Sequence, residues 1–495
     1  MAYATFTDFT AALDKAGELK RIAAPVATEL EITEIADREM KSPGGGKALL
    51  FEKPTIDGRM SPIPVAVNTM GSRRRMAMAL GIESVDELAE QMRLILKAKP
   101  PTGMREAWTL LRQGIDLLHA RPRHVSDGPC KEVVHLLKDD PFSLEQLPIL
   151  KCWPQDGGRF VTLPVVHTRD PDTGERNVGM YRMQIYDGQT TGMHWQVHKV
   201  GARHGKRYYE RGERMPVAVT LGGDPAMTFA ATAPLPDGLD EVLFAGFVRK
   251  KSVELVKCET VDLEVPADSD FVLEGYVQPG ETRAEGPFGD HTGFYTPVEE
   301  YPVFHVTAIT HRKAPIYPAT IVGIPPMEDF YMGSASVRVF LPVFRMNFPE
   351  IVDMALPAEG VFHNLVFVSI RKQYAWQAYK IMHGLWGMGQ MMFSKYIVVV
   401  DEDCDVHNTS EVLFRLCANT DPQRDSTFIK NPCDALDHAQ TVPTIGSHMG
   451  IDATRKLASE GYTRTWPELL KMDQGVKDRV DALLKATPSQ DLWDR

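Results

Sequence analysis

Residues 177–196 read "NVGMYRMQIYDGQTTGMHWQ", and this stretch predicts two consecutive β-strands that are joined at Asp187-Gly188. An Asp-Gly pair between two runs of strand-forming residues is a strong signal for a hairpin turn. Strand-like segments continue on both sides, over residues 160–322. A helix start interrupts them, where Asp224 suits the N-cap and Pro225 the first helical position. We therefore expect the middle of the chain to be a β-barrel-like domain with a few helices on its rim.

The segments on either side of this region have different patterns. Before it, short helices and strands alternate, with helices predicted over residues 73–80, 85–97 and 105–114. After about residue 340, apolar strands alternate with helices, which is typical of an α/β domain with a parallel sheet. We expect a small N-terminal α+β domain, a barrel-like middle domain and a C-terminal α/β domain, over residues 1–120, 121–330 and 331–495.

The stretch 465–485, "TWPELLKMDQGVKDRVDALLK", predicts an amphipathic helix. Its apolar residues recur at helical spacing, at Leu469, Met472, Val476, Val480 and Leu483. Such a stripe is more typical of a helix that packs within the protein or contacts another subunit than of a helix that binds a membrane surface. We expect this helix to take part in oligomerisation.

The composition restricts the class of partner. The chain has 495 residues, of which 43% are hydrophobic and 24% charged, so it can bury a substantial pocket. A formal net charge of −11 argues against nucleic acid or an anionic membrane as the main partner and favours a small molecule. The six cysteines lie far apart in the sequence, without a zinc-type spacing, and we expect them to be reduced. No signal-peptide pattern and no run of about 18 apolar residues is found, so we expect a cytoplasmic protein without a transmembrane segment.

The common nucleotide and hydrolase motifs are absent from the sequence. Neither a Walker A loop nor a complete dinucleotide fingerprint is present, and G-x-S-x-G and H-E-x-x-H are also missing. The stretch "SRRRM" at 72–76 opens a predicted helix with three arginines, which suits either a structural ion pair or a bound anion. The structural ion pair is the favoured interpretation, because charge runs at surfaces are common.

Polar residues on the two strands of the opening stretch are candidates for a ligand site. Asn177 and Arg182 are five positions apart, so they would face opposite sides of a regular strand. A bulge or a strand end is needed to aim both at one ligand. His194 and His198 follow on the second strand or just after it. The spacing alone leaves open whether these four residues share a site.

The stretch 282–294, "TRAEGPFGDHTGF", carries the strongest catalytic signal. Glu285, Asp290 and His291 lie within seven positions around a Gly-Pro-Phe-Gly turn, which presents the two carboxylates from its ends. Positioned carboxylates whose pKa values are pushed apart are suited to acid–base catalysis. An acidic turn in solvent is the alternative.

A family resemblance extends these observations over nearly the whole chain. The motifs "NVGMYRMQ", "HWQVHK", "LGGDPA", "PLPDGLDEVLFAG", "AEGPFGDHTGFY", "FPEIVDMALPAEG", "KYIVVVDEDCDV" and "GSHMGIDAT" follow one another in an order that closely resembles the UbiD family of decarboxylases, which use prenylated FMN. The resemblance implies that the middle domain is a split β-barrel that binds the flavin. It also implies reversible, non-oxidative decarboxylation of an aromatic acid, with a flavin prenyltransferase as the supplier of the cofactor and a homodimer or homohexamer as the assembly.

The resemblance also assigns residues. A divalent metal, usually Mn²⁺, would join the cofactor phosphate to Asn177, His198 and Glu241, and two oxygen donors with an imidazole suit this cation. A K⁺ site would lie near Val178 and residues 230–233, sharing Glu241. The catalytic set would be Arg182, Glu285 and Asp290. The cofactor would be contacted by Met180, Tyr181, Arg182, His194, Trp195, Gln196, His198, Lys199 and Val200.

The same resemblance leaves the substrate open. Aspartate at position 290 matches the ubiquinone-pathway branch, whose substrate is 4-hydroxy-3-polyprenylbenzoate, but "HWQVHKVGARHG" departs from the arginine-bearing form of that branch. Another phenolic, polycyclic or heteroaromatic acid is the alternative. The loop 321–333, "IVGIPPMEDFYMG", would line an apolar entrance or form a buried strand end. Outside the family, an FMN-dependent oxidoreductase or a non-catalytic flavin-binding protein would fit.

The two carboxylates are expected to differ in pKa. Glu285 beside the Arg182 guanidinium should stay ionised, and Asp290, which would face an apolar substrate, should have a raised pKa and carry the proton. The roles of base and acid would then follow from the two environments.

Overall fold

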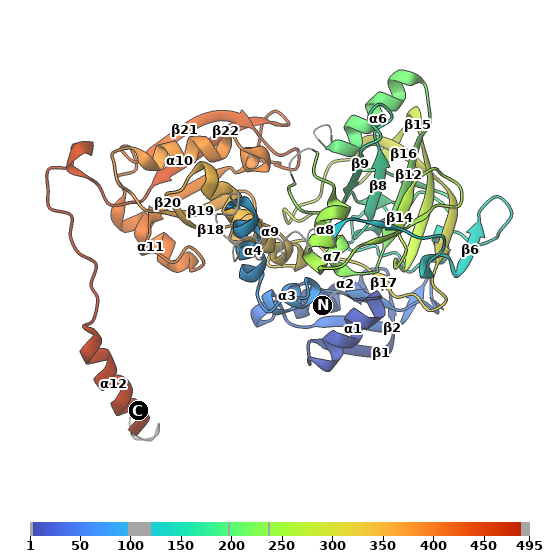
Figure 1. The fold of residues 1–495 in the computed structure, drawn as a ribbon, viewed down its shortest axis with the longest axis horizontal. Coiled ribbons are helices and arrows are strands. Elements are labelled where there is room, and N and C mark those ends of the chain that lie inside the picture. Colours follow the sequence, from blue (N-terminus) through green and yellow to red (C-terminus); the bar gives the residue numbers. More distant parts are fainter. Residues whose placement is uncertain (1–2, 98–119, 197–198, 236–237, 487–495) are drawn as a thin grey trace, which may run out of the picture.

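The computed structural model describes residues 3–97, 120–196, 199–235 and 238–486. Figure 1 shows three regions that follow the colours of the sequence: a blue N-terminal region, a green and yellow strand-rich region beside it, and an orange C-terminal region on the other side. Helices and sheets occur in each region, as the sequence predicts. The domain boundaries given above stay a prediction, because the hydrophobic packing continues from one region into the next.

The N-terminal region is built around a small mixed sheet with the strand order β1-β2-β4-β17, and β3 pairs with β2. Strand β17 (Tyr317–Pro318) comes from much later in the chain and pairs in parallel with β4. Helix α1 begins after Thr5, whose side chain accepts a hydrogen bond from Asp8 N, and it ends shortly before Gly17 at a φ of 71°. The other elements are β1 (Leu19–Ala27), α2 (Glu31–Met40), β2 (Ala48–Ile56), β3 (Arg59–Met60), β4 (Val65–Val67), α3 (Arg73–Ala79) and α4 (Val85–Lys97), and α1 itself spans Phe6–Lys15.

The arginines that open α3 have a structural role, as predicted. The side chain of Arg75 is completely buried and donates hydrogen bonds to the carbonyl oxygens of Asn68, Gly45 and Gly46. Its Nη1 also lies 3.3 Å from Glu18 Oε2. Arg75 thereby donates to three backbone carbonyls, of which Gly45 O also accepts from Asn68 Nδ2 and Asn68 O from Gly71 N. The helix predicted over residues 105–114 lies outside the described residues.

The middle region contains a seven-stranded antiparallel sheet with the order β11-β16-β15-β12-β8-β9, in which β6 pairs with β16. Two smaller sheets, β10-β7 and β14-β13-β5, accompany it. Among the described residues the strand order does not close on itself, so the sheet is an open one. The strands of the middle region, in all three sheets, are β5 (Arg123–His124), β6 (Val133–Leu136), β7 (Phe160–Val161), β8 (Val165–Arg169), β9 (Arg176–Gly179), β10 (Met183–Gln184), β11 (Thr190–Gly192), β12 (Met215–Leu221), β13 (Glu254–Lys257), β14 (Glu264–Pro266), β15 (Phe271–Glu285) and β16 (Glu299–His311).

The turn at Asp187-Gly188 is present, but its two arms pair with different strands. The Asp187 carboxylate accepts hydrogen bonds from Gln189 N and from the backbone and hydroxyl of Thr190, which fixes the reversal. Beyond the bridge between Ile185 and Thr191, β10 pairs with β7 and β11 with β16. The local turn signal was therefore right, while the strand partners are set by the rest of the sheet. Helices α6 (Val200–Arg211), α7 (Pro225–Ala230) and α8 (Glu241–Arg249) complete this region, and Asp224 caps α7 as predicted.

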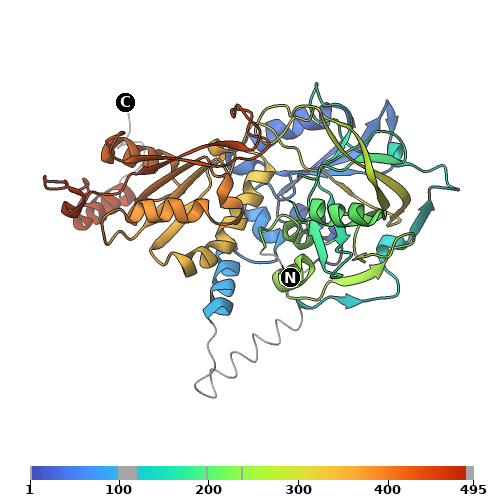
Figure 2. The same cartoon turned by 90° about the horizontal axis from the view of Figure 1, so that it is seen from above.

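A 20-residue helix, α9 (Glu328–Asn347), connects the middle and C-terminal regions. It packs against α4 and β18, and Figures 1 and 2 both show α4 and α9 between the two larger regions. The sequence analysis did not predict α9, whose apolar residues on several sides and internal Pro342 weaken the helical signal.

The C-terminal region contains a five-stranded sheet with the order β18-β19-β20-β22-β21. Its three central strands are parallel, as predicted, and both edge strands are antiparallel. Helices α10 and α11 cover opposite faces, because they contribute to two separate apolar clusters on the sheet. The elements are β18 (Ile351–Ala355), β19 (Leu365–Ile370), α10 (Gln377–Trp386), β20 (Tyr396–Asp401), α11 (Thr409–Asn419), β21 (Ser426–Pro432) and β22 (Ile445–Asp452).

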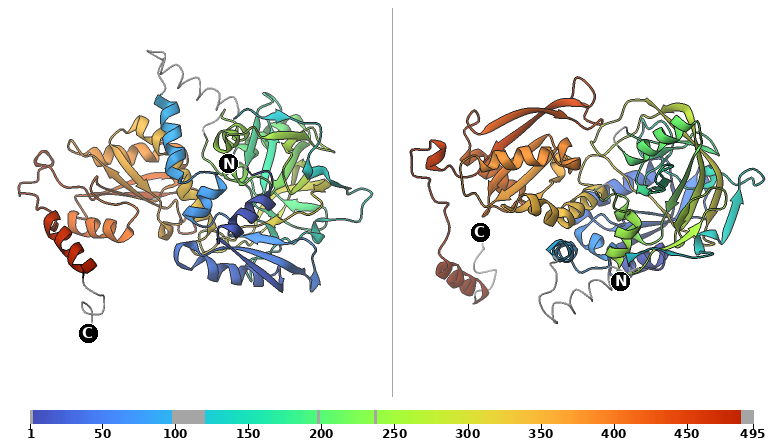
Figure 3. Two further views of the ribbon diagram at one scale, coloured as in Figure 1. Left: turned by 60° about the horizontal axis from the view of Figure 1, so that its bottom comes forward. Right: turned by 45° about the horizontal axis from the view of Figure 1, so that its top comes forward.

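The last described helix, α12 (Gln474–Ala486), begins later than the sequence predicts. Leu469 and Met472, which the helical stripe included, precede it in an irregular segment. No side chain of α12 is buried, and Figure 1 and the right-hand view of Figure 3 show it at the end of an extended segment, away from the rest of the molecule. Its function in oligomerisation stays a prediction.

All six cysteines are free. In the part of the chain that the structure describes, no helix is both long and apolar enough to cross a membrane.

Candidate active site

The three residues predicted to be catalytic meet in one buried cluster. Arg182 lies just before β10, Glu285 ends β15, and Asp290 follows in the next loop. Arg182 Nε and Nη2 donate to the two oxygens of Glu285 at 2.8 and 3.0 Å, and Nη1 donates to Asp290 Oδ2 at 2.5 Å. Glu285 is 1% exposed and Asp290 5%. One guanidinium therefore holds two carboxylates from the two ends of the predicted turn.

The turn itself is anchored in the protein interior. Phe288 is buried, packs against Phe160 at 4.6 Å between ring centroids, and lies under the Arg182 guanidinium, 4.5 Å from it. Gly289 N donates to Asp156 Oδ1 at 2.7 Å, and a Cβ on Gly289 would lie 2.2 Å from a carbon of the Trp153 ring. Position 289 therefore requires glycine. These contacts exclude the alternative of an acidic turn in solvent.

The electrostatics of the two carboxylates differ from the expectation at Asp290. Burial raises the pKa of Glu285, but hydrogen bonds from His194 and Arg182 outweigh it and lower the pKa to about 2. Burial likewise opposes ionisation of Asp290, and the neighbouring His291 and Arg182 overcome it and lower its pKa. The expected rise in the pKa of Asp290 is therefore wrong for this structure. The sequence showed the loop's carboxylates but not that a cation would lie on each side of Asp290.

The proton next to Asp290 is held by His291 instead. His291 Nδ1 lies 2.5 Å from Asp290 Oδ1, and the backbone N of His291 donates to the same oxygen at 2.6 Å. Burial lowers the pKa of His291, but the adjacent carboxylate outweighs it, so the net pKa is raised. The cluster thus contains two cations, Arg182 and His291, that face two anions.

A second group of predicted residues lies beside this cluster. His194 Nδ1 is 3.3 Å from Glu285 Oε2, and its ring packs against Tyr301 at 4.3 Å. Burial lowers the pKa of His194. Trp195 and Tyr181 meet edge to face at 6.5 Å. His194 Nε2 and Trp195 Nε1 are buried and have no hydrogen-bond partner among the described residues, so each could serve a ligand that reaches it.

Asn177 and Glu241, two of the three predicted metal ligands, line one pocket of about 510 Å³. Glu241 Oε2 accepts a hydrogen bond from Val178 N at 3.0 Å, and burial raises the pKa of Glu241 to about 7. The third predicted ligand, His198, lies outside the described residues. Across the residues that are described, no group of three or more His, Cys, Asp or Glu side chains gathers as a metal site.

The wall of the same pocket carries both basic and acidic residues. Arg176, Arg203 and Arg207 line it together with Asp170, Glu175 and Asp240, and Arg176 pairs with Asp240 while Arg207 pairs with Asp170. Lys199 occupies the N-cap of α6 without a side-chain cap, and Val200 at the start of this helix lines the pocket. A helix N-terminus with arginines beside it can bind an anion such as a phosphate.

Other predicted contacts are placed as follows. Met180 and Gln196 are half-buried, on the segments next to Tyr181 and Trp195, and burial lowers the pKa of Lys199. The residues proposed for K⁺ lie at the end of α7, where Ala230 and Ala231 are buried. Asn177 and Arg182 are not on opposite faces of one strand, because β9 ends at Gly179. They lie in two neighbouring clusters, with Glu241 and with Glu285, respectively.

Sequence reasoning missed several residues that hold the cluster. Asp156 fixes the turn, Thr296 Oγ1 accepts a hydrogen bond from Arg182 Nη2 at 3.3 Å, and His363 contacts His291. Each lies on another segment of the chain, and none carries a local motif that would have identified it. His291 was visible in the quoted loop, but no role followed from its position.

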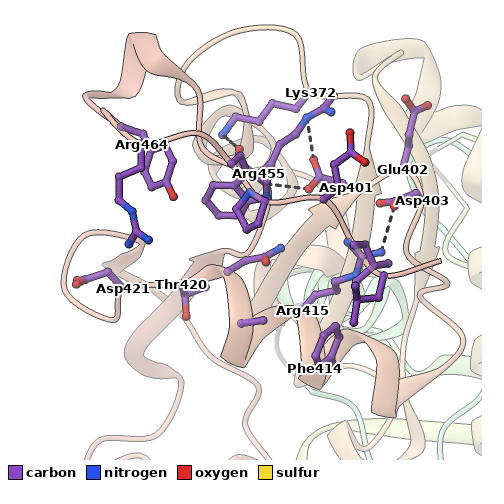
Figure 4. A pocket seen from close by; sticks show the side chains of 18 of the residues that line it. Lys372, Asp401, Glu402, Asp403, Phe414, Arg415, Thr420, Asp421, Arg455 and Arg464 are labelled. Atoms are coloured by element: carbon purple, nitrogen blue, oxygen red, sulfur yellow. Dashed lines mark hydrogen bonds and ion pairs between the residues drawn. The ribbon is translucent and has the colours of Figure 1, made fainter.

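A second pocket lies elsewhere, in the C-terminal region. It has a volume of about 1000 Å³ and opens between the carboxyl ends of β19 and β20 and the segment 462–471. Figure 4 shows charged side chains on its wall that pair with each other, among them Arg415 with Asp403 and Arg455 with Asp401. The cluster of Arg182 is not part of this pocket.

Comparison with known proteins agrees with the fold. Models of the N-terminal, Rift-related and C-terminal domains of the UbiD family, described as 3-octaprenyl-4-hydroxybenzoate carboxy-lyase, match residues 10–95, 123–325 and 330–453. An uncharacterized protein of Archaeoglobus fulgidus is 50% identical over 485 residues, which cover 98% of both chains.

Two solved structures resemble this chain over nearly its whole length. The vanillic acid decarboxylase of Sedimentibacter hydroxybenzoicus, 27% identical, matches in its closed form with a TM-score of 0.83 and covers 98% of this chain and 99% of its own. Its open form matches with a TM-score of 0.79. The UbiD-class enzyme HmfF of Pelotomaculum thermopropionicum in complex with FMN is 27% identical, with a TM-score of 0.80 and coverage of 96% and 98%, and an evolved dimeric form of it was solved with prenylated FMN.

The open antiparallel sheet, the buried Arg-Glu-Asp cluster and these matches define an enzyme of the carboxy-lyase class. The chain belongs to the UbiD family of decarboxylases.

Proposed function

We propose that this enzyme removes CO₂ from an aromatic carboxylic acid with prenylated FMN as its cofactor. The observation that carries the proposal is the buried cluster in which Arg182 holds both Glu285 and Asp290, with His291 as a second cation. Such a cluster can fix a carboxylate substrate and return a proton to the carbon that CO₂ leaves. A flavoprotein without decarboxylase activity would have no use for this arrangement.

The residues around the cluster fit the cofactor. Prenylated FMN supplies, when bound, an electron sink for the charge left by CO₂. His194 Nε2 and Trp195 Nε1 are buried polar atoms without described partners, which suits a polar ring system beside them. The arginines and the helix N-terminus at the start of α6 suit its phosphate.

A cation between phosphate and protein would complete this site. Asn177 and Glu241 supply oxygen ligands from one pocket, and His198 would add an imidazole, a set that suits Mn²⁺. Glu241 is half-buried and burial raises its pKa to about 7, so a cation beside it would stabilise the ionised form. We place K⁺ next to it, near Val178 and the end of α7.

The protein's own residues divide the work of the reaction. Arg182 and Glu285 form an ion pair that keeps the charges of the site in fixed positions. Both side chains stay ionised at neutral pH. Asp290 passes a proton from His291 to the product carbon and is ionised again afterwards. Phe288 and Phe160 keep water from the floor of the cluster. The reaction consumes one proton for each CO₂ released.

The substrate is proposed at the level of an aromatic acid. The family description favours 4-hydroxy-3-polyprenylbenzoate of ubiquinone biosynthesis, and the similar vanillic acid decarboxylase favours a smaller phenolic acid. Ile324, 67% exposed, lies against Gly293 of the active-site loop, so the segment 321–327 has an apolar residue near the site. This position is consistent with an entrance for an apolar aromatic ring.

Release of CO₂ tests the function directly. Protein produced together with a flavin prenyltransferase should show the absorbance of the modified flavin and release CO₂ from at least one acid in a panel of benzoic, naphthoic, furoic and polyprenylated acids. Plain FMN with oxidation of NAD(P)H would overturn the proposal in favour of an oxidoreductase. Activity only on acrylic acids would contradict the aromatic preference.

The metal assignment has its own test. Glu241→Gln keeps the shape of the side chain and removes the charge, so we expect the purified protein to lose most of its metal and flavin while its unfolding temperature changes little. Metal analysis and flavin absorbance measure the first effect, and calorimetry measures the second. Stoichiometric Mn²⁺ and flavin in the variant would show that Glu241 is not a ligand.

A further inference from the structure

A pair of histidines connects the active-site loop to the C-terminal region. His291 Nε2 lies 2.9 Å from His363 Nε2, while the other ring nitrogen of His291 contacts Asp290. His363 belongs to the segment between Gly360 and β19. In the sequence, α9 lies between the active-site loop and this segment. The chain Asp290–His291–His363 therefore spans two regions that are otherwise joined through α9.

The segment that carries His363 is held in an unusual conformation. Val361 and Phe362 both have positive φ values, 45° and 48°, which side chains other than glycine rarely adopt. Phe362 packs against the His291 ring at 5.2 Å between centroids. It also fills the space beside Gly333, where a Cβ would lie 2.9 Å from its ring. The turn at Val361 and Phe362 thus holds the rings of Phe362 and His363 against His291 of the active-site loop.

The hydrogen bonds restrict the protonation of the pair. Only one of two facing Nε2 atoms can donate, and a protonated His291 donates from both nitrogens, to Asp290 and to His363. His363 must then be neutral, accept at Nε2 and carry its proton on Nδ1. Burial lowers the pKa of His363 to about 4, and the pKa of His291 is raised, in agreement with this arrangement.

Three more carboxylates face the pair from other elements. Asp329 at the start of α9 and Asp434 after β21 lie near His291, and Asp434 and Asp437 lie near His363. Burial raises the pKa of Asp329 to about 7, with His291 acting in the opposite direction. Negative charge around the pair therefore comes from both regions, and it favours a proton on His291.

We propose that His363 is a positioning residue that acts through His291: it accepts the Nε2 proton of His291, keeps that ring protonated, and so links proton delivery by Asp290 to the approach of the C-terminal region. The inference rests on the decarboxylase function proposed above. The proton moves from His291 Nδ1 to the ionised Asp290 Oδ1 and from there to the product carbon, which leaves His291 neutral and Asp290 ionised again. Separation of His291 from His363 exposes His291 to water, which supplies the next proton.

The similar vanillic acid decarboxylase occurs in closed and open forms, and this chain matches the closed form with the higher TM-score. A movement of the C-terminal region away from the active-site loop would separate the two histidines.

Three variants separate the role of His363 from a general contact. His363→Leu removes the acceptor, and His363→Gln replaces it with an amide oxygen that can accept the same proton. His438→Leu is the matched control, because His438 packs on Phe294 at 4.1 Å, another contact with the loop, and has no part in the pair. His291→Gln identifies the His291 signal in the spectra of histidine-labelled protein.

The first measurement needs neither cofactor nor substrate. Nitrogen NMR of the labelled protein should give His291 a pKa about one unit lower in His363→Leu than in wild type, since a hydrogen bond from a charged donor is lost. The pKa should be retained in His363→Gln and His438→Leu. The same spectra of wild type should show neutral His363 with its proton on Nδ1. An unchanged His291 pKa in His363→Leu, an equal fall in His438→Leu, or a proton on Nε2 of His363 would overturn the inference.

The second measurement uses the loaded enzyme. The alkaline limb of the kcat–pH profile should move down by about one unit in His363→Leu and stay in place in the other two variants. If the His291 pKa shifts in His363→Leu but the alkaline limb of the kcat–pH profile does not move, His291 does not supply the proton. If wild type releases no CO₂ from any acid, the proposed function fails, whereas the NMR result still decides whether His363 holds the His291 proton.

Discussion

Asp290→Asn keeps the shape of the side chain and removes the carboxylate that Arg182 and His291 share. We expect cofactor and substrate to bind while turnover falls by roughly 10²-fold or more, the usual effect of losing a positioned acid. In heavy water, wild type should place deuterium at the former carboxyl position of the product, and the variant should be slow in that step. Near-normal turnover with normal deuterium uptake would transfer the role of proton donor to Glu285.

Glu285 makes the folded protein sensitive to acid. Its pKa is about 2 in the folded protein against 4.5 ordinarily, so its contribution to stability is present above about pH 4.5 and is lost as the pH falls towards 2. The contribution is on the order of 3 kcal/mol. Calorimetry between pH 5 and 3 should show the unfolding temperature of wild type falling more steeply than that of Glu285→Gln. Parallel curves would mean that Glu285 is not held as an anion.

At this scale the family resemblance predicted which residues meet, and the expected charge state was right for Glu285 and wrong for Asp290. Glu285 and Arg182 form the ion pair that the resemblance implies. The pKa of Asp290 depends on His291 turning back onto its neighbour, a side-chain rotamer that no spacing shows. Asp156, Thr296 and His363 enter the site only through tertiary contacts.

At the scale of elements, helix α3 offers a prediction with a control on the next residue. Arg75→Met leaves the Gly46 carbonyl without its donor and removes one donor each from Gly45 O, Asn68 O and Glu18, so we expect a loss of about 3 kcal/mol in the free energy of unfolding. Arg74, whose side chain is 64% exposed, also pairs with Glu18, and Arg74→Met should cost about 0.5 kcal/mol or less. Equal effects on thermal unfolding would refute the structural role of Arg75. Both variants should keep their CO₂-release activity below the unfolding temperature.

The same comparison explains which elements could be predicted. Helices α3 and α4 agree in their bounds with the sequence analysis to within a residue, and α7 begins at Pro225 after Asp224, as predicted. Helix α9 was missed, because it is apolar on several sides between two regions and contains Pro342. The partners of β10 and β11 were missed for a similar reason: a hairpin signal specifies the turn and not the neighbouring strands.

At the scale of the whole molecule, α12 leads to a prediction about assembly. Val480, Leu483 and Leu484 are each more than 40% exposed, and an isolated helix of 13 residues is marginal in water. We therefore expect α12 to pack on a second copy of the chain, in a homodimer or homohexamer. Light scattering should give a mass that is a multiple of 55.3 kDa, and removal of residues 474–495 should reduce it. A wild-type monomer would contradict the prediction.

The N-terminal sheet has a consequence for synthesis. Its strand β4 acquires its partner β17 only after about 250 further residues have been made, which takes roughly 10–50 s at the usual rates of translation. Throughout that interval one edge of the sheet is unpaired and open to pairing with other nascent chains. The order in which the ribosome releases the chain thus exposes the earliest part of the protein for longest, and a fragment ending at residue 97 should be produced mainly as insoluble aggregate.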